Sequence, residues 1–477
     1  MTDALKPYPA YKDSGLPWLG RIPAHWGERR AKYLFREVDE RSDTGREELL
    51  SVSHMTGVTP RSQKNVTMFM AESYVGHKVC CAGDLIINTM WAWMAALGVA
   101  KQAGIVSPSY AVYRPLQPDA FVPDFVDHLL RTRAYQSEYV CRSTGIRASR
   151  LRLYPEKFLD ILIVCPPYKE QQKLTAYLHA KDRSIRRYIR TKQKLITLLN
   201  ERKQALIRRA VTRGLDPHVR LKPSGVDWLG EVPEHWEVVA LRHLGTRFGS
   251  GMTPRGGATV YQTSGIPLIR SQNVHFDGLR LGDVVFISDE IHSSMSGTHV
   301  KSGDVLLNIT GASIGRVCVA PDGLGEANVN QHVTIIRPRV SKVTPGFLAA
   351  FLSSPFIQGE ITMSAYGAAR EGLPMGDMKA LRILVPPLRE QTQIVDSLRE
   401  STEQIHVSIR AIQREIDLIR EYRTRLIADV VTGKVDVREA AASLPEVEEA
   451  EPPEVEPLEE APEDGVEGAE EVDDADE

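Results

Sequence analysis

An internal duplication constrains this chain more than any other feature of its sequence. Residues 14–26 read SGLPWLGRIPAHW and residues 224–236 read SGVDWLGEVPEHW, so eight of thirteen positions are identical at an offset of 210. A period of this length far exceeds the period of solenoid repeats. The chain is therefore expected to contain a duplicated domain.

Two further matches recur at an offset of 220 and close each copy. Residues 163–171 (IVCPPYKEQ) match 383–391 (ILVPPLREQ), and residues 198–212 match 418–432. The larger offset implies a net ten extra residues in the second copy, between Trp236 and Ile383. The expected segments are a first globular region at 11–166, a spacer helix at 167–213, a second globular region at 221–386, a second spacer helix at 387–433 and a tail at 443–477.

A long helix is expected near the end of each copy. The Pro-Pro pair ends a strand expected at 159–164 or 381–385, because proline has no N–H for a ladder, and a helix follows from Lys169 or Arg389. Alternate steps of four and three residues from Leu174 and from Ile394 meet mostly apolar residues, which is the pattern of a heptad seam. The alternative is an amphipathic helix on its own domain, but a helix of about 60 Å overhangs an ordinary domain. The predicted seam includes Tyr188, Leu195 and Arg202 on the first helix, and Ser408, Glu415 and Tyr422 on the second, where Ile409 and Ile416 widen the stripe.

The globular regions have the pattern of short strands in an α/β or α+β fold. Glycine and proline punctuation is dense, and strands are expected at 84–88, 111–113, 304–308 and 333–336. We expect an α/β (α+β) fold in which two tandem globular domains are joined by two long antiparallel coiled-coil helices with a pseudo-twofold internal repeat.

Charge is divided unevenly along the chain. Residues 439–477 hold 18 of the 62 acidic residues and no Lys or Arg, so residues 1–438 carry 59 bases against 44 acids, a net charge of +15. A body this basic favours a polyanionic partner such as nucleic acid. The acidic C-terminal tail lacks aromatic residues from 443 onward and is expected to be disordered. It is either a solubility tail or a competitor with DNA for the basic surface.

Several classes of protein are disfavoured. No apolar signal segment opens the chain, and the longest nearly apolar run, 90–100, is too short to span a bilayer. The five cysteines form no C-x-x-C pair, so a disulfide framework is unexpected and a cytoplasmic location is the default. No ATP-binding P-loop or H-x-x-x-H metal motif occurs, and the Gly-rich run at 310–315 lacks the lysine of a phosphate loop.

Two repeated motifs invite a catalytic interpretation, and each has a simpler structural one. The sequence Val164-Cys-Pro-Pro-Tyr168 imitates the loop of an amino-methyltransferase, but Cys165 cannot replace its carboxylate or amide, so a strand-to-helix turn is favoured. The pairs His25-Trp26 and His235-Trp236 have no repeated Ser or Cys nearby. We expect each to be a buried Trp that packs against the long helices, beside a hydrogen-bonded His.

The order of these motifs resembles that of the specificity (S) subunit of type I restriction-modification systems. The resemblance rests on W-L-G-x-x-P-x-H-W, a variable region, P-P-x-x-E-Q and a long helix, all repeated, and on residues 308–316 and 328–331 in the second copy. It covers about 11–437. It implies two target recognition domains, each reading half of a bipartite double-stranded DNA site, and a spacer of antiparallel helices.

The resemblance also implies partners. Two methyltransferase subunits and restriction-translocation subunits would assemble on this frame, and their complex would have DNA adenine methyltransferase and ATP-dependent endonuclease activities. S-adenosylmethionine, ATP and Mg would bind those partners, and this chain would bind no cofactor and carry no catalytic residue. Two units read two half-sites about a dyad only if the helices run antiparallel, so each W-L-G segment should meet the end of the long helix that belongs to the other copy.

Residues that reach DNA are expected in the variable regions. Arg and Lys contact phosphates, and Arg, Asn and Gln read base edges. The candidates in the first region lie in a basic loop, whose alternative is a solvated surface: Gly145, Arg147, Arg150 and Arg152. The candidates in the second region are Arg270, Gln272, Asn273, Asn330, Gln331, Gly367 and Arg370.

Two rival functions remain open. A methyltransferase with a fused recognition domain would need a Gly-rich cofactor motif that the sequence lacks. A two-domain DNA-binding scaffold or regulator without restriction partners fits the same residues.

Overall fold

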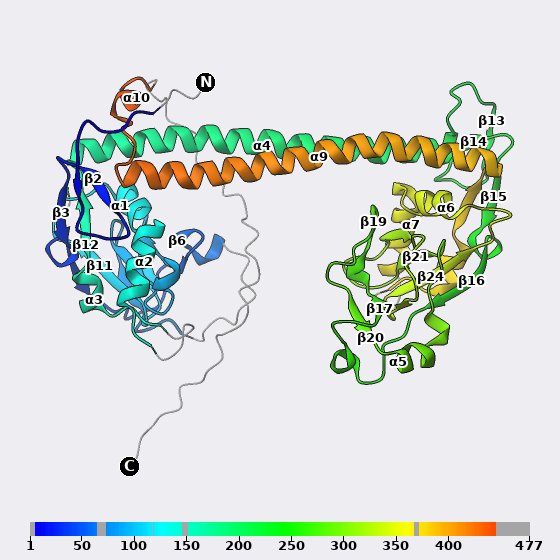
Figure 1. Ribbon diagram of the computed structural model, residues 1–477, viewed down its shortest axis with the longest axis horizontal. Helices are drawn as coiled ribbons and strands as arrows, with labels where there is room; N and C mark the ends of the chain where they lie inside the picture. The colour runs from blue at the N-terminus through cyan, green and yellow to red at the C-terminus, as the bar shows by residue number, and fades with distance from the viewer. Residues whose placement is uncertain (1–4, 64–72, 118, 146–150, 367–371, 445–477) are drawn as a thin grey trace, which may run out of the picture. The chain divides into compact units, whose positions relative to one another are not determined.

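The computed structural model describes residues 5–63, 73–117, 119–145, 151–366 and 372–444 (Figure 1). The chain divides into two compact units, unit 1 (Met1–Ile189 with Asp417–Glu477) and unit 2 (Arg190–Ile416). Helix α4 (Tyr168–Arg213) begins in unit 1 and ends in unit 2, whereas helix α9 (Leu388–Val431) does the reverse. Each unit therefore combines segments that are far apart in the sequence.

Both units contain an antiparallel four-stranded sheet with the same strand order. In unit 1 the order is β4-β11-β8-β9, and in unit 2 it is β16-β24-β21-β22. The mixed helix and sheet fold that the sequence predicts is confirmed. The bounds are β4 (Phe35–Val38), β8 (Leu85–Ile87), β9 (Leu97–Val99), β11 (Ala111–Pro115), β16 (Gly245–Ser250), β21 (Val305–Asn308), β22 (Val317–Val319) and β24 (Val333–Pro338).

A buried carboxylate fixes the same strand pair in each sheet. Asp84, directly before β8, accepts two hydrogen bonds of 3.0 Å from the Arg114 guanidinium on β11. Asp304, directly before β21, accepts two of 2.7 Å from Arg337 on β24. Both aspartates are about 1% exposed. A bidentate pair of this kind adds geometric specificity to charge, which explains why both strands end in Arg-Pro.

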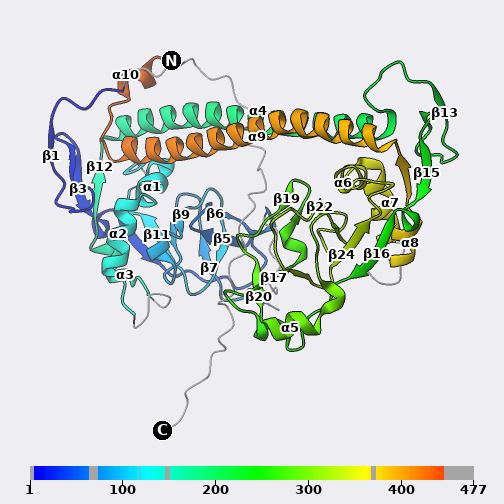
Figure 2. The same cartoon turned by 45° about the vertical axis from the view of Figure 1, so that its right-hand side comes forward.

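Smaller sheets and short helices complete the two units (Figure 2). Unit 1 holds β1 (Tyr11–Asp13), β2 (Arg21–Pro23), β3 (Gly27–Arg30), β5 (Leu50–Ser53), β6 (Gly57–Pro60), β7 (Lys78–Cys80), β10 (Gly104–Val106), β12 (Leu162–Cys165), α1 (Pro123–Leu130), α2 (Arg133–Arg142), α3 (Pro155–Leu159) and α10 (Arg438–Ala442). Unit 2 holds β13 (Leu221–Pro223), β14 (Glu231–Pro233), β15 (Glu237–Ala240), β17 (Ile266–Ile269), β18 (Val274–His275), β19 (Gly278–Leu279), β20 (Val285–Ile287), β23 (Asn328–Val329), β25 (Arg382–Val385), α5 (Asp289–Ser294), α6 (Pro345–Leu352), α7 (Pro355–Tyr366) and α8 (Met375–Ala380).

The strand before each Pro-Pro pair is shorter than the sequence predicts. The expected strand at 159–164 is replaced at its start by the end of α3, and β12 begins only at Leu162. Pro155 stands in the first turn of α3, where proline is tolerated, and Phe158 is buried. The sequence pattern did not separate this short helix from the strand that follows it.

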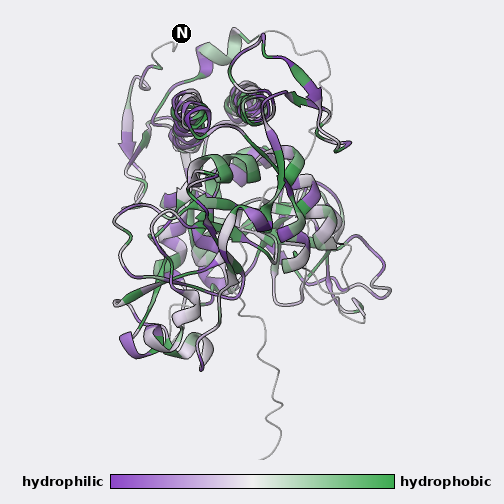
Figure 3. Cartoon of the chain, turned by 90° about the vertical axis from the view of Figure 1, so that its right-hand side faces the viewer, coloured by the Kyte–Doolittle hydropathy of each residue, from purple (hydrophilic) through white to green (hydrophobic). Residues whose placement is uncertain are grey.

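The long helices pair antiparallel within each unit. In unit 2, Lys192 Nζ lies 2.8 Å from Glu415 Oε2, and Lys203 Nζ lies 2.7 Å from His406 Nε2, so residue numbers run in opposite directions along the pair. In unit 1, Arg423 pairs with Asp182. Figure 3 shows that both helices are hydrophilic over most of their circumference, so only a narrow stripe is available for apolar packing.

The buried stripe departs from the predicted seam at alternate positions. On α4, Tyr188 and Leu195 are 38% and 41% exposed, whereas Ile189 and Ile196 are half-buried. On α9, Ile409 and Ile416 lie in the stripe, whereas Ser408 and Tyr422 are exposed. Steps of three and four residues both fit a period of 3.6, so the sequence alone did not fix their order.

Each W-L-G segment packs against the end of the long helix that belongs to the other copy. In unit 1, Leu19 and Trp26 share a core with Val430 and Val431 of α9. In unit 2, Leu229 and Trp236 share a core with Ile207, Ala210 and Val211 of α4. The crossed pairing that antiparallel helices require is confirmed.

The repeated His-Trp and Glu-Gln motifs meet each other in space. In unit 1, Glu170 Oε1 accepts a hydrogen bond of 3.2 Å from Trp26 Nε1, and Glu170 Oε2 lies 2.7 Å from His25 Nε2. In unit 2, Glu390 Oε2 accepts 3.2 Å from Trp236 Nε1 and lies 2.8 Å from His235 Nε2. The expectation of a buried Trp beside a hydrogen-bonded His is confirmed, and its carboxylate partner is a residue that the sequence analysis did not assign.

The glutamine that follows each glutamate ties the helix start to the globular part. The Gln171 carboxamide accepts from Val122 N at 2.9 Å and donates to Pro166 O at 2.9 Å. The Gln391 carboxamide accepts from Thr344 N at 2.8 Å and donates to Pro386 O at 2.8 Å. The Pro-Pro segment is therefore a strand-to-helix turn in both copies, as expected.

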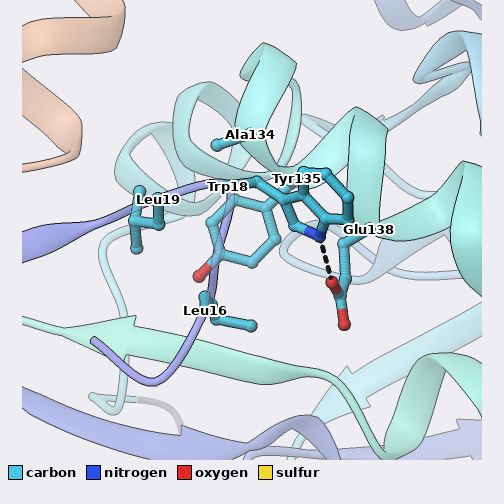
Figure 4. Close-up of a pocket in the computed structure, with 6 residues that line it drawn as sticks. All are labelled: Leu16, Trp18, Leu19, Ala134, Tyr135 and Glu138. Carbon is cyan, nitrogen blue, oxygen red and sulfur yellow. Dashed lines mark hydrogen bonds between the residues drawn. The ribbon is translucent and has the colours of Figure 1, made fainter. Parts of the chain in front are cut away.

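The first tryptophan of each W-L-G segment has a different partner in each unit. Trp18 Nε1 donates to Glu138 Oε2 of α2 at 2.9 Å, in a shallow hollow that Leu16 and Tyr135 also line (Figure 4). Trp228 packs instead on Phe356 of α7, at 5.9 Å between ring centroids.

Within the described ranges, none of the helices combines the length and hydrophobicity that a membrane span requires.

Candidate nucleic-acid interface

Three loops of unit 2 converge beyond one end of its central sheet. Gly251 N, after β16, donates to Val333 O at 3.0 Å, and Ile309 N, after β21, donates to His332 O at 3.0 Å. Asn330 N donates to Ile269 O at 3.0 Å. A Cβ at Gly251 would lie 2.1 Å from Asn330 O, so only glycine permits this approach. The loops are thus held together by their backbones, and their side chains are free to differ.

A chain of hydrogen bonds links four side chains of these loops. Thr253 Oγ1 donates to Gln331 Oε1, Gln331 Nε2 lies 3.0 Å from His332 Nε2, and His332 Nδ1 lies 2.5 Å from Thr310 Oγ1. Gln331 is exposed and His332 is half-buried. Of these four residues, the sequence analysis selected only Gln331. It considered Thr310 only as part of a possible phosphate loop and of the motif at 308–316.

The buried asparagines of this region shape the loops. Asn330 is about 7% exposed, and its Oδ1 accepts from His332 N at 3.2 Å. Asn308 is fully buried, and its Nδ2 donates to Ser271 O at 2.8 Å and to Ser313 Oγ at 3.0 Å. Asn308 therefore joins the 271 segment to the 308–316 loop.

The predicted set at 270–273 lies beside this cluster. Arg270 is half-buried, and its guanidinium lies 5.9 Å from the Tyr261 ring centroid and donates to Asp283 O at 3.2 Å. Gln272 is exposed, and its Nε2 donates to Asp283 Oδ2 at 2.7 Å. Asn273 is fully buried, with its Nδ2 directed to Arg280 O and Asp283 Oδ1. Whether these residues contact DNA stays a prediction.

The convergent loops carry positive charge and no carboxylate. Residues 250–260, 305–320 and 328–339 contain no Asp or Glu, and they contain Arg255, Arg316, Arg337 and Arg339. The nearest acidic residues in sequence are Asp304, whose carboxylate is hydrogen-bonded to Arg337, and Asp322 and Glu326. Arg255 and Arg316 therefore leave these loops with positive charge. A surface of this sign attracts a polyanion.

Unit 1 holds an equivalent cluster with different side chains. Arg152 Nε donates to Thr89 Oγ1 at 3.3 Å, and Thr89 Oγ1 donates to Ser109 O at 2.9 Å. Arg152 also lies over the Tyr154 ring, at 5.9 Å from its centroid. Gly145 is exposed and follows Thr144, whose backbone exchanges two hydrogen bonds with Arg152. The structure therefore brings Gly145 and Arg152 together.

One backbone contact shows that the two clusters occupy equivalent places. Leu153 N donates to Thr89 O at 2.9 Å, and Leu373 N donates to Ile309 O at 2.8 Å, with an offset of 220 for both donor and acceptor. The candidates Arg147, Arg150, Gly367 and Arg370 fall in 146–150 and 367–371, which lie outside the described residues. Those two segments end next to these contacts in the sequence.

The remaining features include Cys165 of the Pro-Pro turn and two tryptophans of unit 1. Burial raises the pKa of the Cys165 thiol to about 12, which suppresses the reactive thiolate. Trp91 and Trp93 are half-buried and stacked, with ring centroids 6.4 Å apart. Across the ranges that the structure describes, no group of three or more His, Cys, Asp and Glu side chains is placed to hold a metal ion.

Comparison with known proteins finds similarity to one family. Residues 233–416 match the model of the type I restriction modification DNA specificity domain. The MjaVIII specificity subunit of Methanocaldococcus jannaschii is 24% identical over 284 residues, which are 59% of this chain and 64% of that protein. Over these residues the chain is similar to type I restriction specificity subunits.

A further relative and a solved structure show how much of the chain is matched. The EcoBI specificity subunit of Escherichia coli is 28% identical over 269 residues, which are 54% of each chain. This chain thus spans between about half and two thirds of the length of these two relatives. A solved chain from work on complex assembly and conformational transition of the type I R-M system superposes with a TM-score of 0.62, at 18% identity, over 87% of this chain and 99% of that one. This likeness supports the fold alone.

Proposed function

We propose that this chain is the DNA-recognition subunit of a type I restriction-modification complex. The observation that carries the proposal is the pair of equivalent loop clusters, one in each unit, which differ in their hydrogen-bonding side chains while their frame is the same. Base edges in the major groove are read by such side chains. Two different clusters on one repeated frame would read two different half-sites.

The target in this proposal is an asymmetric, bipartite site in double-stranded DNA. The globular parts of units 1 and 2 act as target recognition domains, and α4 and α9 act as an antiparallel coiled-coil spacer that sets the gap between the half-sites. The gap itself has no sequence preference, because the helices offer no loop cluster of this kind.

The chain also serves as a scaffold in this proposal. Two methyltransferase subunits and the restriction-translocation subunits assemble on it. DNA adenine methylation, ATP-dependent cleavage and the binding of S-adenosylmethionine, ATP and Mg²⁺ belong to those partners. The half-buried Cys165 in place of an amide or carboxylate supports a recognition role over a methyltransferase role for this chain.

A methylation map tests the proposal. The chain is co-expressed with the methyltransferase encoded next to it, and methylated bases are mapped by single-molecule sequencing. A bipartite motif that requires both proteins supports the proposal. Methylation that the chain leaves unchanged, or a contiguous palindrome, contradicts it and favours the alternative, a two-domain DNA-binding scaffold or regulator without restriction partners.

A second part of the proposal concerns the acidic tail. We propose that residues 443–477 compete with DNA for the basic surface and so weaken nonspecific binding. Deleting this segment should tighten nonspecific binding at low salt in a filter-binding or fluorescence assay. An unchanged affinity and salt slope would leave a solubility role for the tail.

A further inference from the structure

We infer that Gln331 reads an A·T base pair in the half-site of unit 2, and that Thr253, His332 and Thr310 are positioning residues that fix its carboxamide. The inference deepens the proposed function and rests on it. It starts from the hydrogen-bond chain on the convergent loops of unit 2, in which Thr253, His332 and Thr310 had no expected contact with DNA.

The hydrogen-bond chain determines the orientation of the carboxamide. Thr253 Oγ1 donates to Gln331 Oε1, so Gln331 Nε2 is the atom that faces His332, at 3.0 Å. That nitrogen can only donate, so the imidazole accepts on Nε2 and carries its proton on Nδ1. Nδ1 lies 2.5 Å from Thr310 Oγ1, which accepts this proton. Every bond in the chain then has one donor and one acceptor.

The hydrogen-bonding positions that remain unused on Gln331 match those of adenine. A carboxamide has two N–H donors and two acceptor lone pairs, and the two internal bonds use one of each. One donor and one acceptor remain on an exposed side chain. Adenine presents N7 as an acceptor and its N6 amino group as a donor, a pair that glutamine binds bidentately. Guanine presents two acceptors on the same edge. One of them would face Gln331 Oε1, which is also an acceptor, because the internal hydrogen bonds prevent the carboxamide from turning.

The surroundings favour DNA as the ligand. The loops that contribute Thr253, Thr310, Gln331 and His332 contain no carboxylate, and they contain Arg255 and Arg316. Gly251 brings the Thr253 segment against the backbone of 329–333 at a distance that no side chain tolerates. The carboxamide is therefore held on a rigid support, as selective recognition requires.

The experiment uses the full chain with its methyltransferase partner and maps methylated sites in genomic DNA. Gln331→Ala should relax the motif at one A·T pair of one half-site, with about a ten-fold or greater loss of discrimination there. Thr253→Val and Thr310→Val should relax the same position by a smaller factor. Gln331→Glu should move the preference at that position toward C·G, because a carboxylate accepts from the cytosine amino group.

Two controls separate this inference from the proposed function. Gln413→Ala removes another exposed glutamine of unit 2, which lies on α9 and is not a candidate for DNA contact, and it should leave that position unchanged. Specific methylation through the other half-site shows that each variant is folded. If the unmodified chain directs no bipartite motif, the proposed function fails. If it does, but Gln331→Ala and Gln331→Glu keep the motif intact, only the assignment of Gln331 is overturned.

Discussion

The two Glu-Trp-His junctions have the same core and different covers. Glu170 is 7% exposed and is covered by Tyr8, whose hydroxyl donates to Oε1 at 2.8 Å, and by Arg438, whose guanidinium lies 4.8 Å from the Tyr8 ring centroid. The Glu390 side chain is 26% exposed, whereas the two histidines are similarly exposed, 42% for His25 and 48% for His235. In the described part of unit 2, no tyrosine is hydrogen-bonded to Glu390.

Chain connectivity explains this difference. The chain passes the junction of unit 1 twice, as the N-terminal segment that holds Tyr8 and as the segment after α9 that holds Arg438. It passes the junction of unit 2 once, because residues 214–223 both leave α4 and enter the second W-L-G segment. The single segment of unit 2 does not fill the space that two segments fill in unit 1. A hollow of about 300 Å³ lies beside residues 214–221 and is lined in part by Arg209 and Arg213. The duplicated sequence thus gives both units the same Glu-Trp-His contacts. The path of the chain before and after each copy decides which residues cover those contacts.

The largest expected loss of stability comes from removing the buried tryptophan that both junctions share. Trp26→Ala and Trp236→Ala should each lower the free energy of unfolding by about 3–5 kcal/mol, because each removes a fully buried indole and the donor of a buried hydrogen bond. Denaturant unfolding of the full chain measures both. A loss below about 1 kcal/mol for either variant would break the equivalence of the two cores.

Replacing the glutamate of each junction should lower the free energy of unfolding by different amounts in the two units. Glu170→Gln should cost about 2 kcal/mol, since a carboxamide cannot accept from Tyr8, His25 and Trp26 together in a closed site. Glu390→Gln should cost about 1 kcal/mol or less, because water can reach its partners. Native-state hydrogen exchange of helix-start peptides near 170 and 390 reports each site. Equal losses would show that the cover of unit 1 has no energetic role.

Removing one hydroxyl should affect unit 1 alone. Tyr8→Phe deletes the donor to Glu170 and keeps the ring under Arg438, so we expect a loss of about 1 kcal/mol. His218→Ala, at the corresponding place at an offset of 210, is the matched control, because His218 is exposed. It should change the melting temperature by less than the Tyr8 variant does.

The helix pair should respond to pH differently in the two units. Burial, and then the Lys203 ammonium, lower the pKa of His406 in unit 2, with Arg410 acting in the same direction and Glu403 and Asp277 opposing it. The folded state therefore resists protonation of His406, and unit 2 should lose stability as the pH falls through the ordinary pKa of histidine, about 6.5.

Unit 1 should lose its corresponding contact only at lower pH. Burial alone would raise the pKa of Asp182, but Arg423 and Arg186 outweigh burial and lower it. The stability from this pair is present above the ordinary pKa of aspartate, about 4, and is lost as the pH falls toward the lower folded value. Hydrogen exchange along α4 between pH 7 and 5 should show faster opening near Lys203 than near Asp182. Thr402→Asp, which gives Lys203 the carboxylate that Arg423 has, should reduce that difference, and exchange that is uniform along α4 would contradict the expectation.

Much of this architecture could be predicted from the sequence because the repeat encodes it locally. The Pro-Pro turn, the long helices and the buried tryptophans follow from patterns within each copy. The crossed packing of the W-L-G segments was expected from the resemblance and from the antiparallel helices that two half-sites require. The order of steps along the seam could not be predicted, because Ile189 and Tyr188 both fit a helical period and only the opposite helix selects one of them.

The candidate interface was predicted only in part. Gln331 and Arg152 were found by residue type. Thr253 and His332 gave no signal, and Thr310 appeared only as a member of the motif at 308–316, because the roles of these three residues arise from hydrogen bonds across three loops. Asn273 and Asn330 looked like base-reading residues in the sequence, and the structure places both in the buried frame of the loops.

The sequence by itself determined that the chain is a basic, duplicated protein with two variable regions on one repeated plan, because identical spacing requires identical local structure. The tertiary structure decided which glutamate meets which tryptophan, which face of each long helix is buried and which polar side chains stand together on the loops. Those contacts join residues far apart in the chain, 144 positions for Trp26 and Glu170 and 241 positions for Asp182 and Arg423, and hydrogen bonds over such separations depend on packing that no local pattern records.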